Sequence, residues 1–116
     1  MSSRPRDDGS ASIVAASMMA VLLAITVGAV HIGSAVVARH RAQAAADMAA
    51  LSAATEIPAG SRVACEQASA VARAMRTALA ACDVHELDVV VTVDAQVALA
   101  LWGLGPARAI ARAGPA

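Results

Sequence analysis

The distribution of hydrophobic and polar residues divides the chain into a long apolar run and a mixed C-terminal part. The run from Ile13 to Ala38 contains no Asp, Glu, Lys or Arg. A helix of this length extends about 39 Å, which exceeds the ~30 Å hydrocarbon core of a membrane. Residues 13–38 are therefore predicted to form a transmembrane helix. The alternative is a cleavable secretory signal, although the apolar part of such a signal usually spans about 7–15 residues.

The helical pattern continues beyond the apolar run. Strong helix formers fill the following residues, and no Gly or Pro occurs between Ser34 and Pro58, so we expect one helix from Ser12 to Thr55. Residues 39–57 form its extension into water, and Pro58 ends it. A thin apolar stripe on this extension consists of Ala44, Met48, Leu51 and Thr55. Such a stripe is expected to pack against another surface.

Residues 58–116 are predicted to form a small α+β domain. Ser61 can cap an amphipathic helix over residues 62–76, whose apolar face contains Ala64, Ala68, Val71, Ala72 and Met75. Residues 87–94 alternate with a period of two and are rich in β-branched side chains, which predicts a strand. We expect a preceding strand over residues 79–84, joined through His85 and Glu86, a loop at residues 102–106, and a third strand over residues 107–113. The predicted fold is one amphipathic helix packed on a short antiparallel sheet, attached to a long N-terminal transmembrane helix.

Composition limits the chemistry that this domain can support. The chain has thirty-three Ala, no Phe or Tyr, and Trp102 as its single aromatic residue. Its formal net charge of zero argues against nucleic-acid binding. Bulky groups that line substrate pockets are scarce, and no spacing pairs a nucleophile with a base. The predicted protein is therefore not an enzyme and takes no cofactor or small-molecule substrate.

The polar residues near the predicted turn are weak candidates for a metal site. His85, Glu86 and Asp88 are close in sequence, but in a strand Glu86 and Asp88 would share a face that His85 does not share, and three ligands do not close a site. A solvated turn is the preferred interpretation. Arg108 and Arg112 on the third strand could line a partner face, or guard a solvated strand edge with charge.

The two cysteines provide the evidence on topology. Cys65 and Cys82 both lie in the C-terminal part, with sixteen residues between them. They are either a disulfide in an oxidising compartment or two unrelated buried thiols. A core this poor in large side chains gains about 3 kcal/mol from closing such a loop, so we predict the disulfide. Residues 1–12 would then be a cytoplasmic tail and residues 58–116 would be extracytoplasmic, because arginines flank the apolar run on both sides and do not decide its orientation.

Small residues within the apolar run suggest how it could contact other helices. Ala20, Ala24 and Gly28 recur every four residues and form a flat ridge that permits close helix approach. An alanine-rich composition also produces such ridges by chance. His31 is the one ionisable residue of the run, and an intramembrane ionisable group is a candidate for a functional role.

Two segments resemble a known family. Residues 8–12, the apolar helix, and residues 38–54 with their Arg-His-Arg and Ala-Ala-Asp-Met-Ala-Ala-Leu sequences resemble the N-terminal region of TadE/TadG-like pilus-assembly proteins. The downstream order of Cys65, an alanine-rich helix, Cys82-Asp83-Val84, residues 88–93 and residues 111–115 is similar to the short actinobacterial helicase/secretion neighbourhood TadE-like branch.

This resemblance implies a minor pilin-like membrane subunit of a Tad/Flp-type pilus assembly or secretion system. It would span the membrane once, act by helix packing through Ala20, Ala24, Gly28, Ala44, Met48 and Leu51, and have pilin-like or Tad secretion-platform proteins as partners. Processing by a prepilin peptidase would fall between Gly9 and Ser10, but Val14 stands where such pilins carry Glu. The alternative function is a small single-pass membrane protein that binds or regulates another envelope partner.

Overall fold

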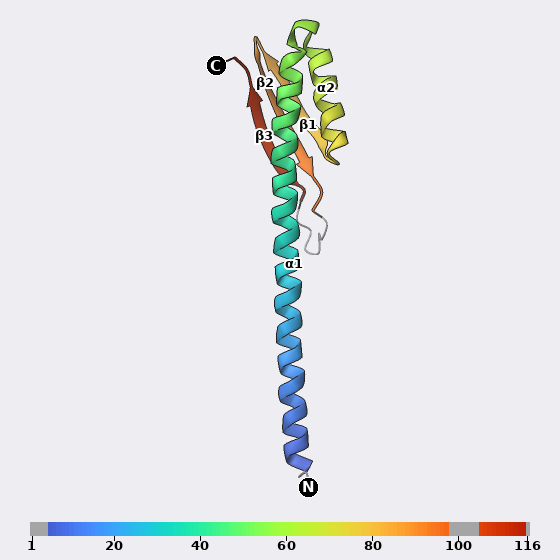
Figure 1. Ribbon diagram of the computed structural model, residues 1–116, viewed down its shortest axis with the longest axis vertical. Helices are drawn as coiled ribbons and strands as arrows, with labels where there is room; N and C mark the ends of the chain where they lie inside the picture. The colour runs from blue at the N-terminus through green and yellow to red at the C-terminus, as the bar shows by residue number, and fades with distance from the viewer. Residues whose placement is uncertain (1–4, 98–104, 116) are drawn as a thin grey trace. The chain divides into compact units, whose positions relative to one another are not determined.

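The computed structural model describes residues 5–97 and 105–115, and it has the predicted α+β fold (Figure 1). Helix α1 spans Pro5–Thr55, a 3-10 turn η1 spans Ile57–Ala59, and helix α2 spans Ser61–Ala74. Strands β1, β2 and β3 span Ala78–His85, Asp88–Ala95 and Ala107–Ala113. The chain divides into two compact units, residues 1–33 and residues 34–116. Residues 1–4 of the predicted tail and residues 102–104 of the predicted loop lie outside the described residues.

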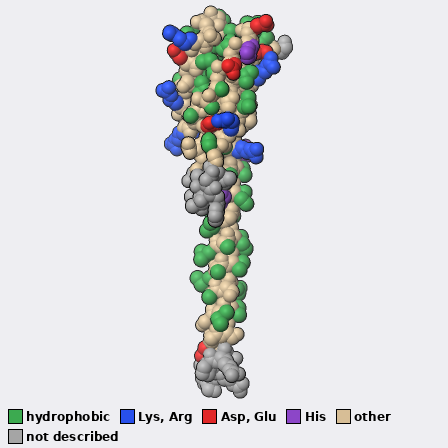
Figure 2. All heavy atoms as spheres, turned by 180° about the vertical axis from the view of Figure 1, so that it is seen from behind, with side chains coloured by type: hydrophobic (Ala, Val, Ile, Leu, Met, Phe, Trp, Pro, Cys, Tyr) green, Lys and Arg blue, Asp and Glu red, His purple; other side chains and the backbone are tan. Residues whose placement is uncertain are grey.

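Helix α1 is long and apolar enough to cross a membrane by length and composition. Thirteen large apolar side chains between Ile13 and Val37 are exposed, each by 48% or more of its surface, and Figure 2 shows such side chains around the helix in green. An apolar surface of this extent on a soluble protein marks a membrane or protein contact. Helix α1 therefore has the surface expected of a transmembrane segment over these residues.

The second unit is built on a three-stranded antiparallel sheet in the order β1-β2-β3. His85 pairs with Asp88, so the turn between β1 and β2 consists of Glu86 and Leu87. This turn lies one residue later than predicted, and Leu87 is exposed in it instead of starting the strand. Glu86 has a φ of 56°, a left-handed conformation typical of the first position in a two-residue hairpin turn.

One face of the sheet is covered by α2 and by the C-terminal part of α1 (Figure 1). Val89, Val91 and Val93 of β2 point into this interface and are fully buried. Alanine forms most of the rest of the core, because the buried positions of α1 are Ala38, Ala42, Ala45, Ala46, Ala49, Ala50 and Ala53. We refer to these seven residues as the alanine seam. The helix extension is thus an integral part of the C-terminal unit.

The ends of α2 differ in detail from the prediction. Ser61 is the first helical residue and Gly60, with a φ of 108°, is the N-cap, so no side chain caps this end. The predicted apolar face is correct: Ala64, Ala68 and Ala72 are buried against the sheet. At the C-terminal end, the Thr77 amide and hydroxyl both donate to the Ala72 carbonyl, at 2.9 and 2.7 Å. The Met75 amide also donates to this carbonyl, at 3.1 Å, so several hydrogen bonds close the C-terminal end of α2.

Candidate interaction surfaces

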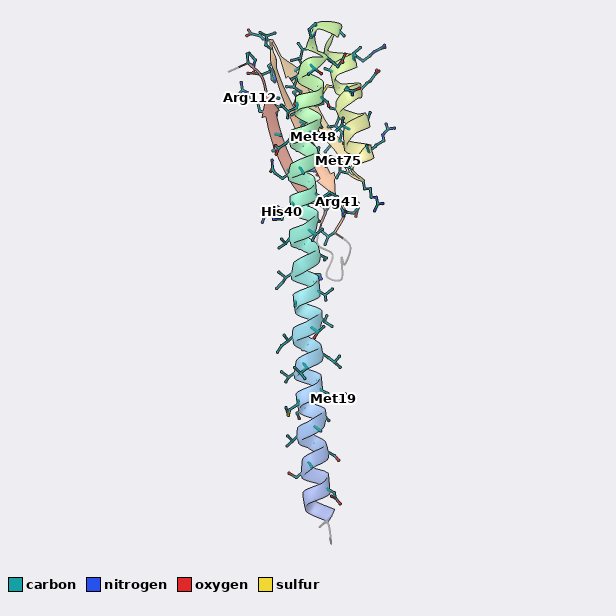
Figure 3. The ribbon with its side chains drawn as sticks, in the orientation of Figure 1. Met19, His40, Arg41, Met48, Met75 and Arg112 are labelled. Atoms are coloured by element: carbon teal, nitrogen blue, oxygen red, sulfur yellow. A yellow bond between two sulfur atoms is a disulfide. The ribbon has the colours of Figure 1, made fainter. Side chains whose placement is uncertain are left out.

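The stripe that the sequence predicts on the helix extension is solvent-exposed. Ala44, Met48 and Leu51 all lie on the outside of α1, with Met48 52% and Leu51 59% exposed, and Figure 3 shows Met48 on this helix. The alanine seam, whose residues from Ala42 to Ala53 share one core cluster with the sheet, was not predicted from the sequence. The seven alanines recur three and four residues apart, and this spacing could have indicated a buried helix face. The outer stripe of Ala44, Met48 and Leu51 therefore lies on the solvent side of the part of the chain that the structure describes, outside the buried core.

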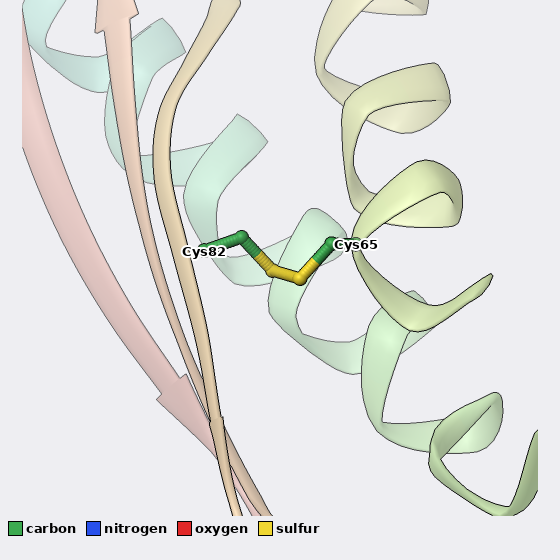
Figure 4. Close-up of a disulfide and its surroundings, with 2 residues drawn as sticks. All are labelled: Cys65 and Cys82. Carbon is green, nitrogen blue, oxygen red and sulfur yellow. A yellow bond between two sulfur atoms is a disulfide. The ribbon is translucent and has the colours of Figure 1, made fainter. Parts of the chain in front are cut away.

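The two cysteines form the predicted disulfide. Cys65 on α2 and Cys82 on β1 are joined with their Cα atoms 5.9 Å apart (Figure 4). The bond links a helix to an edge strand whose burial is otherwise shallow, since only Leu79, Cys82 and Val84 of β1 contact the core, each partly buried. The covalent bond to α2 therefore holds β1 on the core, where its own side chains bury little surface.

The small-residue ridge lies within the first unit. Ala20 and Ala24 are exposed, and a Cβ atom built on Gly28 would meet no atom within 4 Å. The ridge is thus sterically open to another helix. Gly9 and Ser10 are both helical residues of α1, and a Cβ on Gly9 would also meet nothing within 4 Å.

The sheet face opposite the helices carries two cross-strand ion pairs. Arg108 on β3 binds Asp94 on β2 through both carboxylate oxygens, at 2.8 and 3.0 Å. Arg112 on β3 forms an ion pair with Asp88 on β2. The sequence predicts Arg108 and Arg112 on a partner face or a solvated edge and does not identify their carboxylate partners. The antiparallel register, which places Asp94 opposite Arg108, was needed to find them.

The Asp94–Arg108 pair changes the ionisation of both groups. Hydrogen bonding from Arg108, aided by its charge, lowers the pKa of Asp94 below its ordinary value of 3.8, and partial burial opposes this shift. Hydrogen bonding to Asp94 raises the pKa of Arg108. Both groups are therefore charged at neutral pH, as a structural ion pair requires.

Two adjoining grooves lie between α1 and β3. One, of about 500 Å³, is lined by Val36, Arg39, His40, Gln43 and residues 108–110. The second, of about 430 Å³, shares Arg39 and Arg108 and is otherwise lined by Ala35, Val97 and residues 105–107. Both are open and shallow, and neither brings together the groups of an acid–base or nucleophilic mechanism.

The weak metal candidates do not form a metal centre. Among residues 5–97 and 105–115, no three His, Cys, Asp or Glu side chains are grouped to hold a metal ion. His85 and Glu86 are exposed in the turn region, and Asp88 is engaged by Arg112. The predicted geometry was wrong in one respect, because Glu86 is a turn residue and His85 pairs with Asp88 across the hairpin.

Comparisons with known proteins find a family match in the N-terminal half of the chain. Residues 9–56 match the family model described as Flp pilus-assembly TadE/G-like. The chain is also 61% identical over 54 residues to a protein named "Apoptosis inhibitor Rv3654c" from Mycobacterium tuberculosis (strain ATCC 25618 / H37Rv). That similarity covers 47% of this chain and 64% of the relative, so the chain spans less than two thirds of the relative's length. No solved structure matches the chain.

Proposed function

We propose that this chain is a minor pilin-like membrane subunit of a Tad/Flp-type pilus assembly or secretion system, because residues 9–56 match the TadE/G-like Flp pilus-assembly family model. It acts by packing its helix against other subunits and catalyses no reaction. Residues 13–38 cross the membrane, residues 1–12 lie in the cytoplasm, and the disulfide-containing domain lies outside. The observation that carries the proposal is the exposed apolar length of α1, which thirteen large side chains cover from Ile13 to Val37.

Two surfaces of α1 serve the proposed contacts. Within the membrane, the ridge of Ala20, Ala24 and Gly28 allows the backbone of a second helix to approach closely, where packing and not the hydrophobic effect drives association. Outside the membrane, Met48 and Leu51 project from the domain and are about half exposed. Apolar anchors of this kind are typical of the centre of a protein–protein contact.

A substitution test separates steric from chemical roles of the membrane segment. Ala24→Leu and Gly28→Leu should reduce the recovery of pilin-like or platform partners after crosslinking in membranes, because a large side chain keeps the helices apart. Ala15→Leu and Gly33→Leu are matched controls, since at about 100° per residue they fall on the opposite side of the helix from the ridge. These controls should leave partner recovery unchanged.

Substitution of polar residues that could have a chemical role tests the alternative to helix packing. Ser17→Ala, His31→Ala and His85→Ala should leave assembly intact if packing is the mechanism. If these changes abolish function while the leucine substitutions on the ridge leave partner recovery unaltered, the packing proposal is wrong and a proton-linked or catalytic role would replace it.

A further inference from the structure

Charge is separated along the C-terminal unit, although this unit as a whole has equal numbers of arginines and carboxylates. In the antiparallel sheet, Ala78, Asp94 and Arg108 lie at one end and His85 and Asp88 at the other. At the first end, which we call the basic end, lie the start of the helix extension, the C-terminal end of α2 and the start of β3 (Figure 1). These segments carry Arg39, Arg41, Arg73, Arg76 and Arg108, and Asp94 is the register partner of Arg108. The hairpin end has Arg62 and Arg112 with Glu56, Glu66, Asp83, Glu86 and Asp88. Asp47 lies between the two ends on α1, where it accepts a hydrogen bond from Gln43 at 3.1 Å. Figure 3 shows His40 and Arg41 toward the first end of the sheet and Arg112 toward the second.

The arginines of the basic end come from three elements that the fold brings together. Arg39 on α1 and Arg108 on β3 line the same grooves. Arg41 on α1 and Arg76 after α2 line a third, smaller hollow. Arg39 directly follows the apolar run that ends at Ala38, so these cations are tethered to the end of the membrane-spanning segment.

These charges are not neutralised by the protein itself. Within residues 5–97 and 105–115, the ion pairs join Arg62, Arg108 and Arg112 to carboxylates, and Arg39, Arg41 and Arg76 have no carboxylate partner. All three are exposed. Because Asp94 neutralises Arg108, the surplus positive charge of this surface comes from Arg39, Arg41, Arg76 and Arg73, and Arg73 donates a hydrogen bond to the Ser69 hydroxyl.

The grooves combine this charge with an apolar wall. Beside Arg39, the first groove is lined by Val36, Ala109 and Ile110, and Val36 and Ile110 are 48% and 61% exposed. Ala35 and Val97 continue the apolar lining in the second groove. A ligand that fits must carry an anionic group and an apolar chain. Phospholipids have this composition, and a membrane surface presents them where a transmembrane helix emerges.

We propose that the basic end is a docking surface for anionic phospholipids. The guanidinium groups of Arg39, Arg41 and Arg76 bind lipid phosphates, and the groove along Val36 and Ile110 takes the adjoining part of an acyl chain. Planar guanidinium groups suit phosphate oxygens particularly well. Such contacts hold the domain against the bilayer, which leaves the outer stripe of Met48 and Leu51 at a defined height for a partner. This inference depends on α1 crossing a membrane and goes beyond the assembly role.

The test uses the full chain purified in neutral detergent and titrated with phosphatidylglycerol or phosphatidylcholine, with bound lipid counted by native mass spectrometry. The wild-type chain should retain phosphatidylglycerol in preference to phosphatidylcholine. Arg39→Gln combined with Arg76→Gln should weaken phosphatidylglycerol binding about thirtyfold, since one Arg near an anionic surface contributes roughly a factor of five. Added salt should weaken the wild-type binding as well.

A matched control removes the same charge from the other end of the domain. Arg62→Gln combined with Arg112→Gln gives the same net charge as the test variant and should keep binding within about twofold. Equal losses in both double variants, no loss in the test variant, or equal retention of both lipids would overturn the proposal. Partner recovery after crosslinking is a separate readout, so failure here is distinguishable from failure of the assembly role. Thermal unfolding of each variant confirms that its domain is intact.

Discussion

Asp94 and Arg108 illustrate how single residues organise the open face of the sheet. They are register partners on β2 and β3, and two hydrogen bonds join the guanidinium to the carboxylate. The Asp94 side chain retains 22% of its exposure and the Arg108 side chain 62%. Solvent therefore screens the pair, and its main effect is to fix the pairing of an edge strand that consists largely of alanine.

The lowered pKa of Asp94 predicts a pH dependence of stability. Hydrogen bonding from Arg108 makes the folded state bind a proton less readily than the unfolded state. The stabilisation from Asp94 is thus fully present above its ordinary pKa of 3.8 and is lost as the pH falls through the lower folded value. Thermal unfolding between pH 6 and about pH 2 should show this loss, and Asp94→Asn should reduce it. An unchanged pH profile in Asp94→Asn would contradict the assignment to this pair.

At the scale of elements, the alanine seam determines how α1 packs on the sheet. The periodicity of the sequence predicted α1, α2 and the central strand, because each depends on local spacing. It could not show which face of the extension is buried. Met48 and Leu51 are the larger apolar side chains and were predicted to contact other subunits. The face that packs on the sheet instead presents only methyl groups, at positions such as Ala45 and Ala49.

Enlarging one seam residue should therefore disrupt the packing of α1 on the sheet. Ala49 is completely buried, so Ala49→Leu should lower the free energy of unfolding by about 1–3 kcal/mol through overpacking. Ala44→Leu makes the same chemical change on the exposed face and should alter stability by less than about 0.5 kcal/mol. Thermal or denaturant unfolding of the detergent-solubilised chain compares the two. Similar losses for both variants would show that the seam is not tightly packed.

At the scale of the whole molecule, the disulfide bears on the cellular compartment in which the C-terminal domain lies. Cys65 and Cys82 are 17 residues apart in sequence, and their bond ties α2 to β1. Sequence spacing alone left free thiols as an alternative, because nothing local brings a helix and a strand together; the register of β1 beside α2 does so. A disulfide persists in an oxidising environment, which is consistent with the proposed extracytoplasmic domain.

Thiol chemistry in intact cells should test both the bond and the topology. Neither cysteine should react with a membrane-impermeant maleimide until a reductant is added, after which both should be labelled from outside. Reduction should lower the free energy of unfolding by about 3 kcal/mol, whereas Cys65→Ala combined with Cys82→Ala should make the chain insensitive to reductant. Labelling without reduction would exclude the bond. Labelling only after the cells are lysed would place the domain in the cytoplasm.

The alanine seam also has a consequence for how this sequence can change over evolutionary time. Its composition has the appearance of a low-complexity tract, in which substitutions usually accumulate freely. The seven buried positions are fully or almost fully enclosed, so we expect drift there to be confined to Gly and Ser, while Ala44, the exposed alanine among them, accepts a wide range of residues. Alanines of one helix would then diverge at very different rates, and the slow ones would trace the contact between helix and sheet.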